Sequence, residues 1–372
     1  MTKREQELLD IIKENPYISQ NELADLLNIK RSSVAVHISN LIKKGYLVGR
    51  AYVINSNLSK DVCIIGGCNI DFIAKSFDKL NMKDSNPGTL EYSFGGVGKN
   101  IAENLVKMGI DNKFISVFGD DIYSKEVKDY LKNIGVDYSN SKFLTNKGMS
   151  NYISILDENN DLFTAISSME VLEEINIDFI SKIIDLIKSY KYIVMDTNLR
   201  EDVLEFICKN CPNSKIIVDC VSRKKALKIK KLLRYIYLIK PNIYEAEELT
   251  EVPYNNEEDL EKIIKVFLNK GVKKVFISMG NEGIIYADKN ENGIVKIEEE
   301  LKIENTSGCG DAAMSGIIYG EVNGYEILEC AKFGNIAGRI TAQSMDTVSK
   351  DISEKNLLYF GGSYEIRKIF NS

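Results

Sequence analysis

Histidine is nearly absent from this sequence, which contains a single one, His37, in 372 residues. Serine and cysteine nucleophiles usually need a histidine base within hydrogen-bond reach, so this shortage disfavours Ser-His and Cys-His catalysis. A structural zinc site is disfavoured as well. Cys208 and Cys211 form a CxxC pair, but no second pair or histidine cluster completes the usual four ligands.

Long apolar runs are also missing. No stretch approaches the length of a membrane span, and the start of the chain, MTKREQELLD, lacks the apolar core of a signal peptide. The seven cysteines are an odd number in a long chain without a secretion signal, a pattern typical of reduced thiols. The sequence therefore predicts a cytoplasmic protein with no membrane partner.

The charge is unevenly distributed along the chain. Residues 1–60 carry nine Lys and Arg against six Asp and Glu, a net charge of +3, and because the whole chain has −6, the remainder has −9. At 372 residues the chain is too long for one small domain. A mildly basic amino-terminal segment followed by an acidic remainder indicates a small nucleic-acid-binding module joined to a larger domain.

Residues 1–57 predict three short helices followed by two short strands. Pro16 ends the first helix, and Ser19 with Glu22 forms a capping box that opens the second. This order resembles a winged helix-turn-helix domain, with the strands as a small wing. The resemblance implies that the exposed side of the third helix and the wing contact DNA, through Arg31, Ser32, Ser33, His37, Lys43 and Arg50. A dimerisation or docking module with a solvated charged face remains the alternative.

Residues 61–372 predict an α/β domain in which strands and helices alternate. Runs such as IIVDCV and VFISMG are apolar throughout, as expected for parallel strands that helices cover on both faces. Residues 88–94 and 148–168 instead alternate apolar and polar side chains. They predict strands with one solvated face, which would form a small lid sheet over the site.

Polar residues follow several of these strands and should meet at one edge of the sheet. Ligands of such folds bind at the carboxyl ends of the parallel strands. The residues in question are Asp71, Asp196, Asp219, Asn242 and Gly280.

Two glycine-rich stretches precede predicted helices. In FGGVGKNIAENL, residues 94–105, glycine allows the backbone to approach a polar ligand, and Asn100 can hold a sugar hydroxyl. In NTSGCGD, residues 305–311, the amides of Gly308, Cys309 and Gly310 begin a helix and can receive phosphate oxygens.

Asp311 lies beside that anion hole. A carboxylate repels a bound phosphate, so it needs another role, and accepting a proton from the attacking hydroxyl supplies one. The alternative is that Asp311 only caps its helix, a contribution of about 1 kcal/mol. Cys309 has no basic partner in the sequence, so we expect its backbone amide, and not its thiol, to matter.

These stretches resemble the ribokinase-like family of carbohydrate and nucleoside kinases. NTSGCGD is similar to the family's G-x-G-D signature, GGVGKN to its amino-terminal glycine signature, and KPNIYEAEEL to its N-x-x-E motif. The resemblance implies a mostly parallel sheet flanked by helices with a small β lid, an ATP-dependent phosphotransferase, and Asp311 as the catalytic base. It implies an acceptor site that contains Asn69, Asp71, Gly96, Asn100 and Asn198, and an ATP site that contains Asn242, Glu245, Ser278, Gly280, Thr306 and Asn335.

The resemblance also bears on cofactors and substrate. Glu245 would act on Mg²⁺ indirectly, through water, with Asn242 near the nucleotide phosphates. Asn305 stands where the family usually has an aspartate that helps to bind potassium, so activation by a monovalent cation does not follow. DSNPGTLEYSFGGVGKNIAENL, VDCVS and LIKPNIYEAEEL resemble the pseudouridine kinases.

These resemblances imply phosphorylation of the 5′-hydroxyl of pseudouridine with MgATP, by a chain that also binds DNA, and for DNA binding we expect a homodimer. Inosine, cytidine, ribose or fructose as the substrate, or a kinase fold that serves only as the sensor of a transcriptional regulator, remain the alternatives.

Overall fold

The computed structural model describes residues 2–14, 18–44, 46–48, 53–54, 61–299 and 302–370. Its largest element is a nine-stranded sheet in the order β17-β16-β15-β14-β13-β12-β11-β3-β6. Six neighbouring strands are parallel and the three at the β17 edge are antiparallel. The strands are β3 Val62–Ile65, β6 Asn112–Ile115, β11 Tyr192–Asp196, β12 Lys215–Asp219, β13 Ile236–Lys240, β14 Lys274–Ser278, β15 Ile284–Ala287, β16 Asn292–Ile297 and β17 Tyr364–Arg367.

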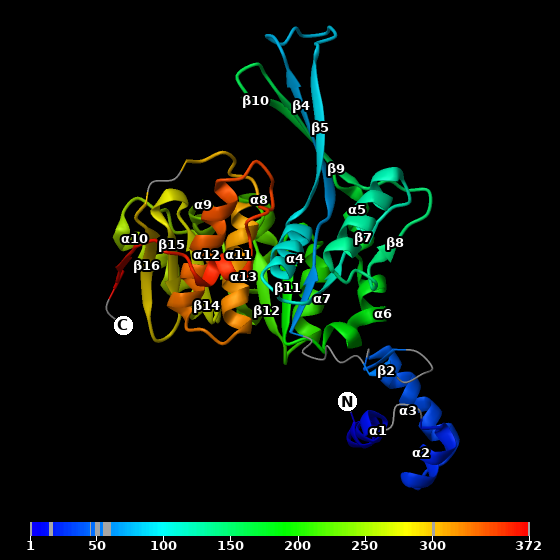
Figure 1. Ribbon diagram of the computed structural model, residues 1–372. Coiled ribbons are helices and arrows are strands. Elements are labelled where there is room, and N and C mark those ends of the chain that lie inside the picture. Colours follow the sequence, from blue (N-terminus) through cyan, green and yellow to red (C-terminus); the bar gives the residue numbers. More distant parts are fainter. Residues whose placement is uncertain are drawn as a thin grey trace.

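Helices cover both faces of this sheet (Figure 1). Apart from the exposed edge strand β17, the strands are rich in isoleucine and valine and are buried along most of their length, because each face packs on a separate apolar core. The helices on one face are α6 Ile177–Ile187, α7 Glu201–Asn210, α9 Ile243–Thr250 and α10 Glu257–Asn269. Those on the other are α4 Val97–Lys107, α5 Ile122–Ile134, α11 Cys309–Val322 and α12 Ile327–Ala342. The predicted doubly covered, mostly parallel sheet is confirmed.

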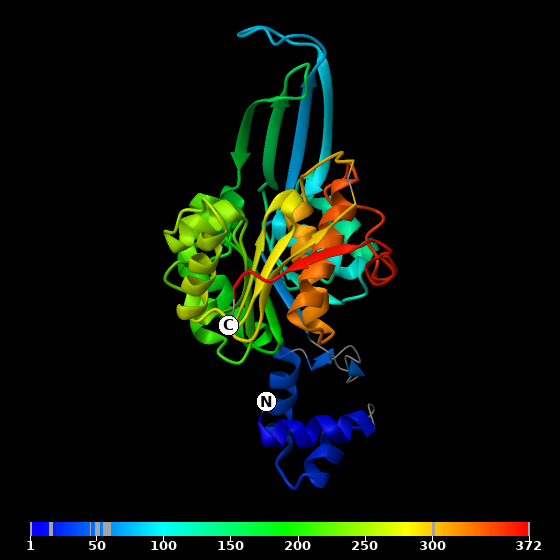
Figure 2. The ribbon, with the colours of Figure 1, turned by 90° about the vertical axis from the view of Figure 1, so that its left-hand side faces the viewer.

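A second, four-stranded sheet stands out from this body in both views (Figures 1 and 2). Its order is β10-β9-β4-β5, and its strands are β4 Asn69–Ser76, β5 Gly88–Gly95, β9 Ser150–Leu156 and β10 Leu162–Ser168. We call it the lid sheet.

The two predicted lid segments are therefore strands, but two details differ from the prediction. β4 is also a lid strand, whereas the sequence analysis placed Asp71 at the end of a strand of the main sheet. Every residue of β10 is exposed, so this strand does not have the expected single solvated face.

The amino-terminal segment, residues 2–54, has its own small apolar core, formed by side chains between Leu8 and Leu47. Ser19 and Glu22 exchange the two hydrogen bonds of the predicted capping box. Its elements are α1 Lys3–Glu14, α2 Gln20–Leu26, α3 Arg31–Lys43 and the antiparallel pair β1 Leu47–Val48 and β2 Val53–Ile54. Three helices and a two-stranded wing are thus present as predicted.

The remaining short elements connect these layers. They are the strands β7 Val117–Phe118 and β8 Lys142–Phe143 and the helices α8 Arg223–Ala226 and α13 Glu354–Leu358.

Candidate active site

A buried carboxylate ties two glycine turns together at the carboxyl edge of the sheet. Oδ2 of Asp196, at the end of β11, accepts hydrogen bonds from the amides of Gly67 at 2.7 Å and Gly98 at 3.1 Å. A Cβ on Gly66 would lie 2.2 Å from this oxygen, so only glycine permits the approach. Burial raises the pKa of Asp196, and hydrogen bonds from the amides of Gly67 and Asn198 oppose that rise. This contact fixes the start of α4, which carries Asn100.

The predicted acceptor residues Asn69 and Asp71 lie together on the lid strand β4. The side-chain amide of Asn69 donates to Oδ1 of Asp71, and a Cβ on Gly95 would lie 1.9 Å from Oδ2. Burial raises the pKa of Asp71 to about 6, while the Asn69 hydrogen bond and the charge of Lys99 oppose the rise. Asp71 was expected to follow a core strand. It belongs instead to the lid, which brings it to the same edge from a different sheet.

Asp311 and Asn100 meet although 211 positions separate them in the sequence. The amide Nδ2 of Asn100 donates to Oδ2 of Asp311 at 2.7 Å. Burial raises the pKa of Asp311 to about 7, and the nearby charge of Asp219 adds to the rise, while Asn100 and Lys240 oppose it. Such a carboxyl group can take up a proton near neutral pH. Oδ1 of Asn100 is buried and accepts no hydrogen bond from the described residues, so it is available to a ligand hydroxyl.

The backbone at the start of α11 presents amides beside Asp311. Gly308 is the N-cap residue, with a φ of 79°, and a Cβ there would lie 1.9 Å from the carbonyl oxygen of Thr347. The first amides of a helix have no acceptor within the helix. The amides of Gly308, Gly310 and Asp311 are therefore available to an anion, whereas the amide of Cys309 is available only in part.

Cys309 lies in the same turn, but its surroundings make it a poor nucleophile. Its amide donates to the carbonyl oxygen of Thr306 at 3.3 Å, so that amide is partly engaged. Burial and the charge of Asp311 raise the pKa of its thiol to about 11. The side chain is therefore a neutral thiol at neutral pH.

Lys240 is a feature of the site that the sequence analysis missed. It ends β13, its side chain is buried, and its Nζ lies 3.6 Å from Oδ2 of Asp219. A Cβ on Gly310 would lie 3.8 Å from the same Nζ, so the ammonium group is close to the amides at the start of α11. A lysine at the end of an apolar strand, directly before Pro241 and Asn242, was the signal that could have revealed it.

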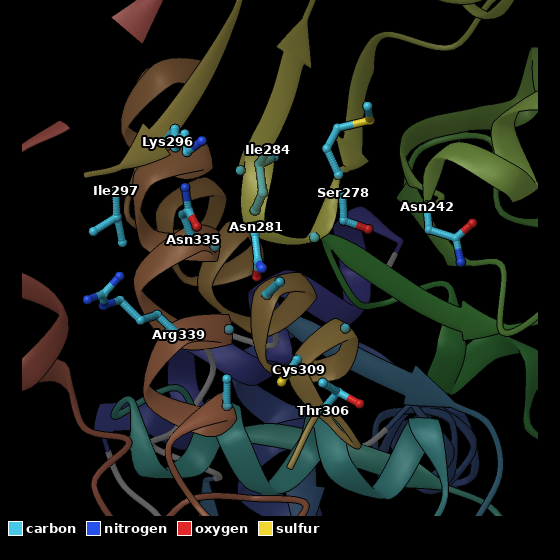
Figure 3. A pocket seen from close by; sticks show the side chains of 18 of the residues that line it. Asn242, Ser278, Asn281, Ile284, Lys296, Ile297, Thr306, Cys309, Asn335 and Arg339 are labelled. Atoms are coloured by element: carbon cyan, nitrogen blue, oxygen red, sulfur yellow. The ribbon is translucent and has the colours of Figure 1, made fainter. Parts of the chain in front are cut away.

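A cavity of about 940 Å³ opens between α11, α12 and the antiparallel edge of the sheet. Figure 3 shows Cys309 and Thr306 near one end of it and Lys296 near the other. Of the residues predicted for ATP, it is lined by Asn242, Ser278, Gly280, Thr306 and Asn335. Lys296 and Arg339 also line it and were not predicted, because nothing in their sequence neighbourhood marks them.

Asn242 and Glu245 begin α9 with a capping box. Oδ1 of Asn242 accepts from the amide of Glu245, and Oε2 of Glu245 accepts from the amide of Asn242, both at 2.9 Å. The side chain of Asn242 thus caps α9, and Asn242 also lines the cavity. Glu245 is buried and so does not lie on a solvated helix face, although its surrounding stretch EAEEL is acidic. Burial raises its pKa.

The donor chemistry beside the cavity fits an indirect role of Glu245 toward Mg²⁺. In the described part of the chain, no three His, Cys, Asp or Glu side chains are grouped so that they could hold a metal ion. Mg²⁺ commonly keeps several waters and is held by substrate phosphates with one or two carboxylates. Glu245 does not itself line the cavity, but it exchanges two hydrogen bonds with Asn242, which does, so its carboxylate lies one residue behind the cavity wall.

Asn198 follows β11, and hydrogen bonds to other residues of the protein hold it in place, so its side chain does not point freely into a pocket. Its amide N–H donates to Oδ1 of Asp196 at 2.9 Å, and its side-chain oxygen accepts from Nζ of Lys225 at 2.6 Å. A Cβ on Gly67 would lie 3.3 Å from its Nδ2. Asn198 is thus next to the turn that leads into the acceptor residues of β4.

The residues predicted to contact DNA lie mostly on one side of α3. Arg31, Ser32 and Lys43 are exposed, and Ser33 and His37 are half-buried. Val34, Ile38 and Leu41 on the opposite side pack into the core of the amino-terminal segment. Arg50 lies outside the described residues.

Comparison with known proteins places this arrangement in a family. The model of the pfkB family of carbohydrate kinases matches residues 59–354, and the model of a winged helix-turn-helix DNA-binding domain matches residues 1–48. The chain therefore belongs to the pfkB family, whose members are phosphotransferases with a hydroxyl group as acceptor. It is a sugar or nucleoside kinase of that family.

Individual proteins of known sequence or structure are similar to most of this chain. An uncharacterized sugar kinase of Escherichia coli, YeiI, is 30% identical over 96% of this chain and 98% of its own length. The pseudouridine kinase of the same organism is 31% identical over 80% of this chain and 95% of its own. Among solved structures, one described as a sugar kinase from Clostridium perfringens has a TM-score of 0.76 and 32% identity, and covers 83% of this chain and 98% of its own.

No helix among the described residues combines the length and the apolar character needed to cross a membrane.

Proposed function

We propose that this kinase transfers the γ-phosphoryl group of ATP to the 5′-hydroxyl of pseudouridine. The observation that carries the proposal is the hydrogen bond between Asn100 and Asp311, which joins the predicted acceptor side to the anion-binding start of α11. The likeness to the pseudouridine kinase of Escherichia coli supports this choice of acceptor.

Asp311 acts as the general base in this proposal. Its pKa of about 7 lets it accept the proton of the 5′-hydroxyl at neutral pH as that oxygen attacks the γ-phosphorus in line. Asn100 holds the carboxylate in place through one oxygen. The Asp311 oxygen that Asn100 does not engage is then free to face the hydroxyl.

The charge that develops on the transferring group is balanced by the start of α11. The amides of Gly308, Cys309 and Gly310, with that of Asp311, donate to phosphoryl oxygens, and the ammonium group of Lys240 adds a positive charge next to them. Because Lys240 is buried, its attraction for the phosphoryl group is screened less than that of a surface lysine.

ATP occupies the cavity beside α12 in this proposal, with Ser278, Gly280, Thr306 and Asn335 around it and Asn242 toward the phosphates. Asn69, Asp71, Gly96 and Asn198 line the acceptor side. Glu245 would hold waters of the Mg²⁺ ion, which neutralises phosphate charge when it is bound.

The test is a steady-state comparison of acceptors with MgATP: pseudouridine, uridine, inosine, cytidine, ribose and fructose. We expect pseudouridine to have the highest kcat/KM. A higher value for inosine or a free sugar would refute this choice of acceptor and leave the kinase assignment untouched.

A second activity, DNA binding, is favoured by the exposed face of α3 and the match of residues 1–48 to a DNA-binding winged helix-turn-helix. A net charge of +3 on residues 1–60 gives one copy little attraction for DNA, so we propose a homodimer that presents two α3 helices to half-sites about one helical turn apart. Exposed apolar side chains on the lid sheet, such as Leu90 and Ile166, support an association of copies.

Fluorescence anisotropy with DNA from upstream of the chain's own gene tests this activity, with and without nucleoside. Binding should weaken steeply with salt, and Arg31→Ala with Lys43→Ala should reduce the salt dependence. Absence of binding by a dimeric preparation at low salt would refute it.

A further inference from the structure

Lys225 is a half-buried lysine that lacks a carboxylate partner within the described residues. Its Nζ donates to Oδ1 of Asn198 at 2.6 Å, which uses one of its three N–H groups. Lys228, one turn away, is instead satisfied by the carbonyl oxygens of Thr197 at 3.0 Å and Leu199 at 2.7 Å. Two donors of Lys225 therefore remain for another acceptor.

The loop that carries Lys225 is fixed to the carboxyl edge of the sheet. Val221 has a φ of 57°, a left-handed conformation that is rare for a β-branched residue. Its amide donates to Oδ1 of Asp219 at 2.9 Å, which holds the loop at the end of β12. Strain of this kind persists where the surrounding structure fixes the backbone, and it gathers at functional sites. Helix α8, and Lys225 with it, begins directly after this turn.

The position of Lys225 next to Asn198 places it on the acceptor side. Asn198 lies against Gly67, in the turn that leads into Asn69 and Asp71. The same turn is tied through Asp196 to the start of α4. Through Asn198, the ammonium group of Lys225 is thus held beside the backbone that carries the proposed acceptor residues. Lys225 does not line the ATP cavity.

Among the candidate substrates that accept the phosphoryl group, the chemistry of Lys225 favours one with an electron-rich oxygen outside the sugar. A half-buried ammonium group without a counter-ion gains most from a carbonyl oxygen or another strong acceptor. A nucleobase such as uracil offers two carbonyl oxygens, whereas free ribose offers only hydroxyl groups.

We propose that Lys225 is a specificity-determining residue, which donates a hydrogen bond to an oxo group on the base of a nucleoside acceptor and thereby selects nucleosides over free sugars. This inference rests on the proposed function, because it assumes a nucleoside acceptor. Asn198 anchors the ammonium group for this contact.

The test is the kinetics of the full-length protein and its Lys225→Met variant. The KM for pseudouridine should rise roughly 10- to 100-fold in the variant, as expected for the loss of one hydrogen bond from a charged group, and the KM for MgATP should not change. The inhibition constant of ribose, measured as a competitor of pseudouridine, should also stay unchanged, since ribose has no oxo group to lose. Lys225→Arg should restore much of the affinity for pseudouridine.

Lys224→Met, at an exposed lysine of the same helix, is the matched control and should behave like the wild type. An unchanged KM for pseudouridine in Lys225→Met, or an equal loss for ribose, would overturn the inference while pseudouridine turnover by the wild type still upheld the proposed function. Failure of the wild type to phosphorylate pseudouridine would refute both.

Discussion

Replacement of Asp311 by asparagine tests the role of the general base with little change in shape. Asparagine can still accept the hydrogen bond that Nδ2 of Asn100 now gives to Oδ2 of Asp311 at 2.7 Å, so α4 and α11 should stay in register. What is lost is the ability to take a proton. A positioned base usually contributes about 10²- to 10⁴-fold, or roughly 3–5 kcal/mol of barrier, and we expect kcat to fall by that amount.

The pH dependence sharpens this prediction. Because the pKa of Asp311 is raised to about 7, kcat/KM of the wild type should rise with pH up to about 7 and then level off. The Asp311→Asn variant should lose that rise. Wild-type activity in the variant, or the same pH profile, would refute the assignment of Asp311 as the base.

Stability provides an independent check with a defined sign. The native state keeps the Asp311 proton up to about pH 7, whereas an unfolded aspartate releases it near 3.8, so the native state binds more protons between these values. The contribution of Asp311 to stability is therefore present at low pH and is lost as the pH rises toward 7. Asp311→Asn should melt at a higher temperature than the wild type at pH 8 and show no such gain at pH 4. Asp178→Asn, at an exposed aspartate in the first turn of α6, should show neither effect.

Three further predictions concern the start of α11 and its neighbour. Cys309→Ala should keep most of its activity, because its backbone amide is retained, and a loss as large as that of Asp311→Asn would revive a role for the thiol. Gly308→Ala should lower the melting temperature by several degrees, since the new Cβ would lie 1.9 Å from the carbonyl oxygen of Thr347. An unchanged melting temperature would contradict this close approach of the backbone at Gly308. Lys240→Met should lower kcat by at least 10-fold, measured in the same kinase assay beside exposed Lys224→Met, and an active variant would remove Lys240 from the mechanism.

The sequence predicted the elements of the main sheet well because their patterns are local. Apolar runs marked β11, β12, β13 and β14, and polar residues at their ends, such as Asp196 and Asp219, do lie at one edge. The motif of α11 could be read in the same way, since a glycine turn before a helix bares amides whatever the rest of the chain does.

Contacts between distant parts of the chain could not be predicted. Nothing near Asp196 indicates that its carboxylate accepts a hydrogen bond from the amide of Gly67, 129 positions away. The lid strand β4 was missed because Asp71 was assigned to the end of the buried strand before it. Lys240 and Lys225 were missed for a related reason: a lysine in a loop or at a strand end is usually solvated, and only the fold shows that Lys240 is buried and Lys225 half-buried.

The most direct test of the central claim is to identify the product formed by the purified protein from pseudouridine and MgATP. Phosphorus NMR with coupling to the ribose protons locates the phosphate on one oxygen. The proposed geometry predicts pseudouridine 5′-phosphate with one ADP formed for each molecule of product, and almost none from Asp311→Asn. A phosphate on the 2′- or 3′-oxygen, or no phosphorylated nucleoside from a folded preparation, would contradict it.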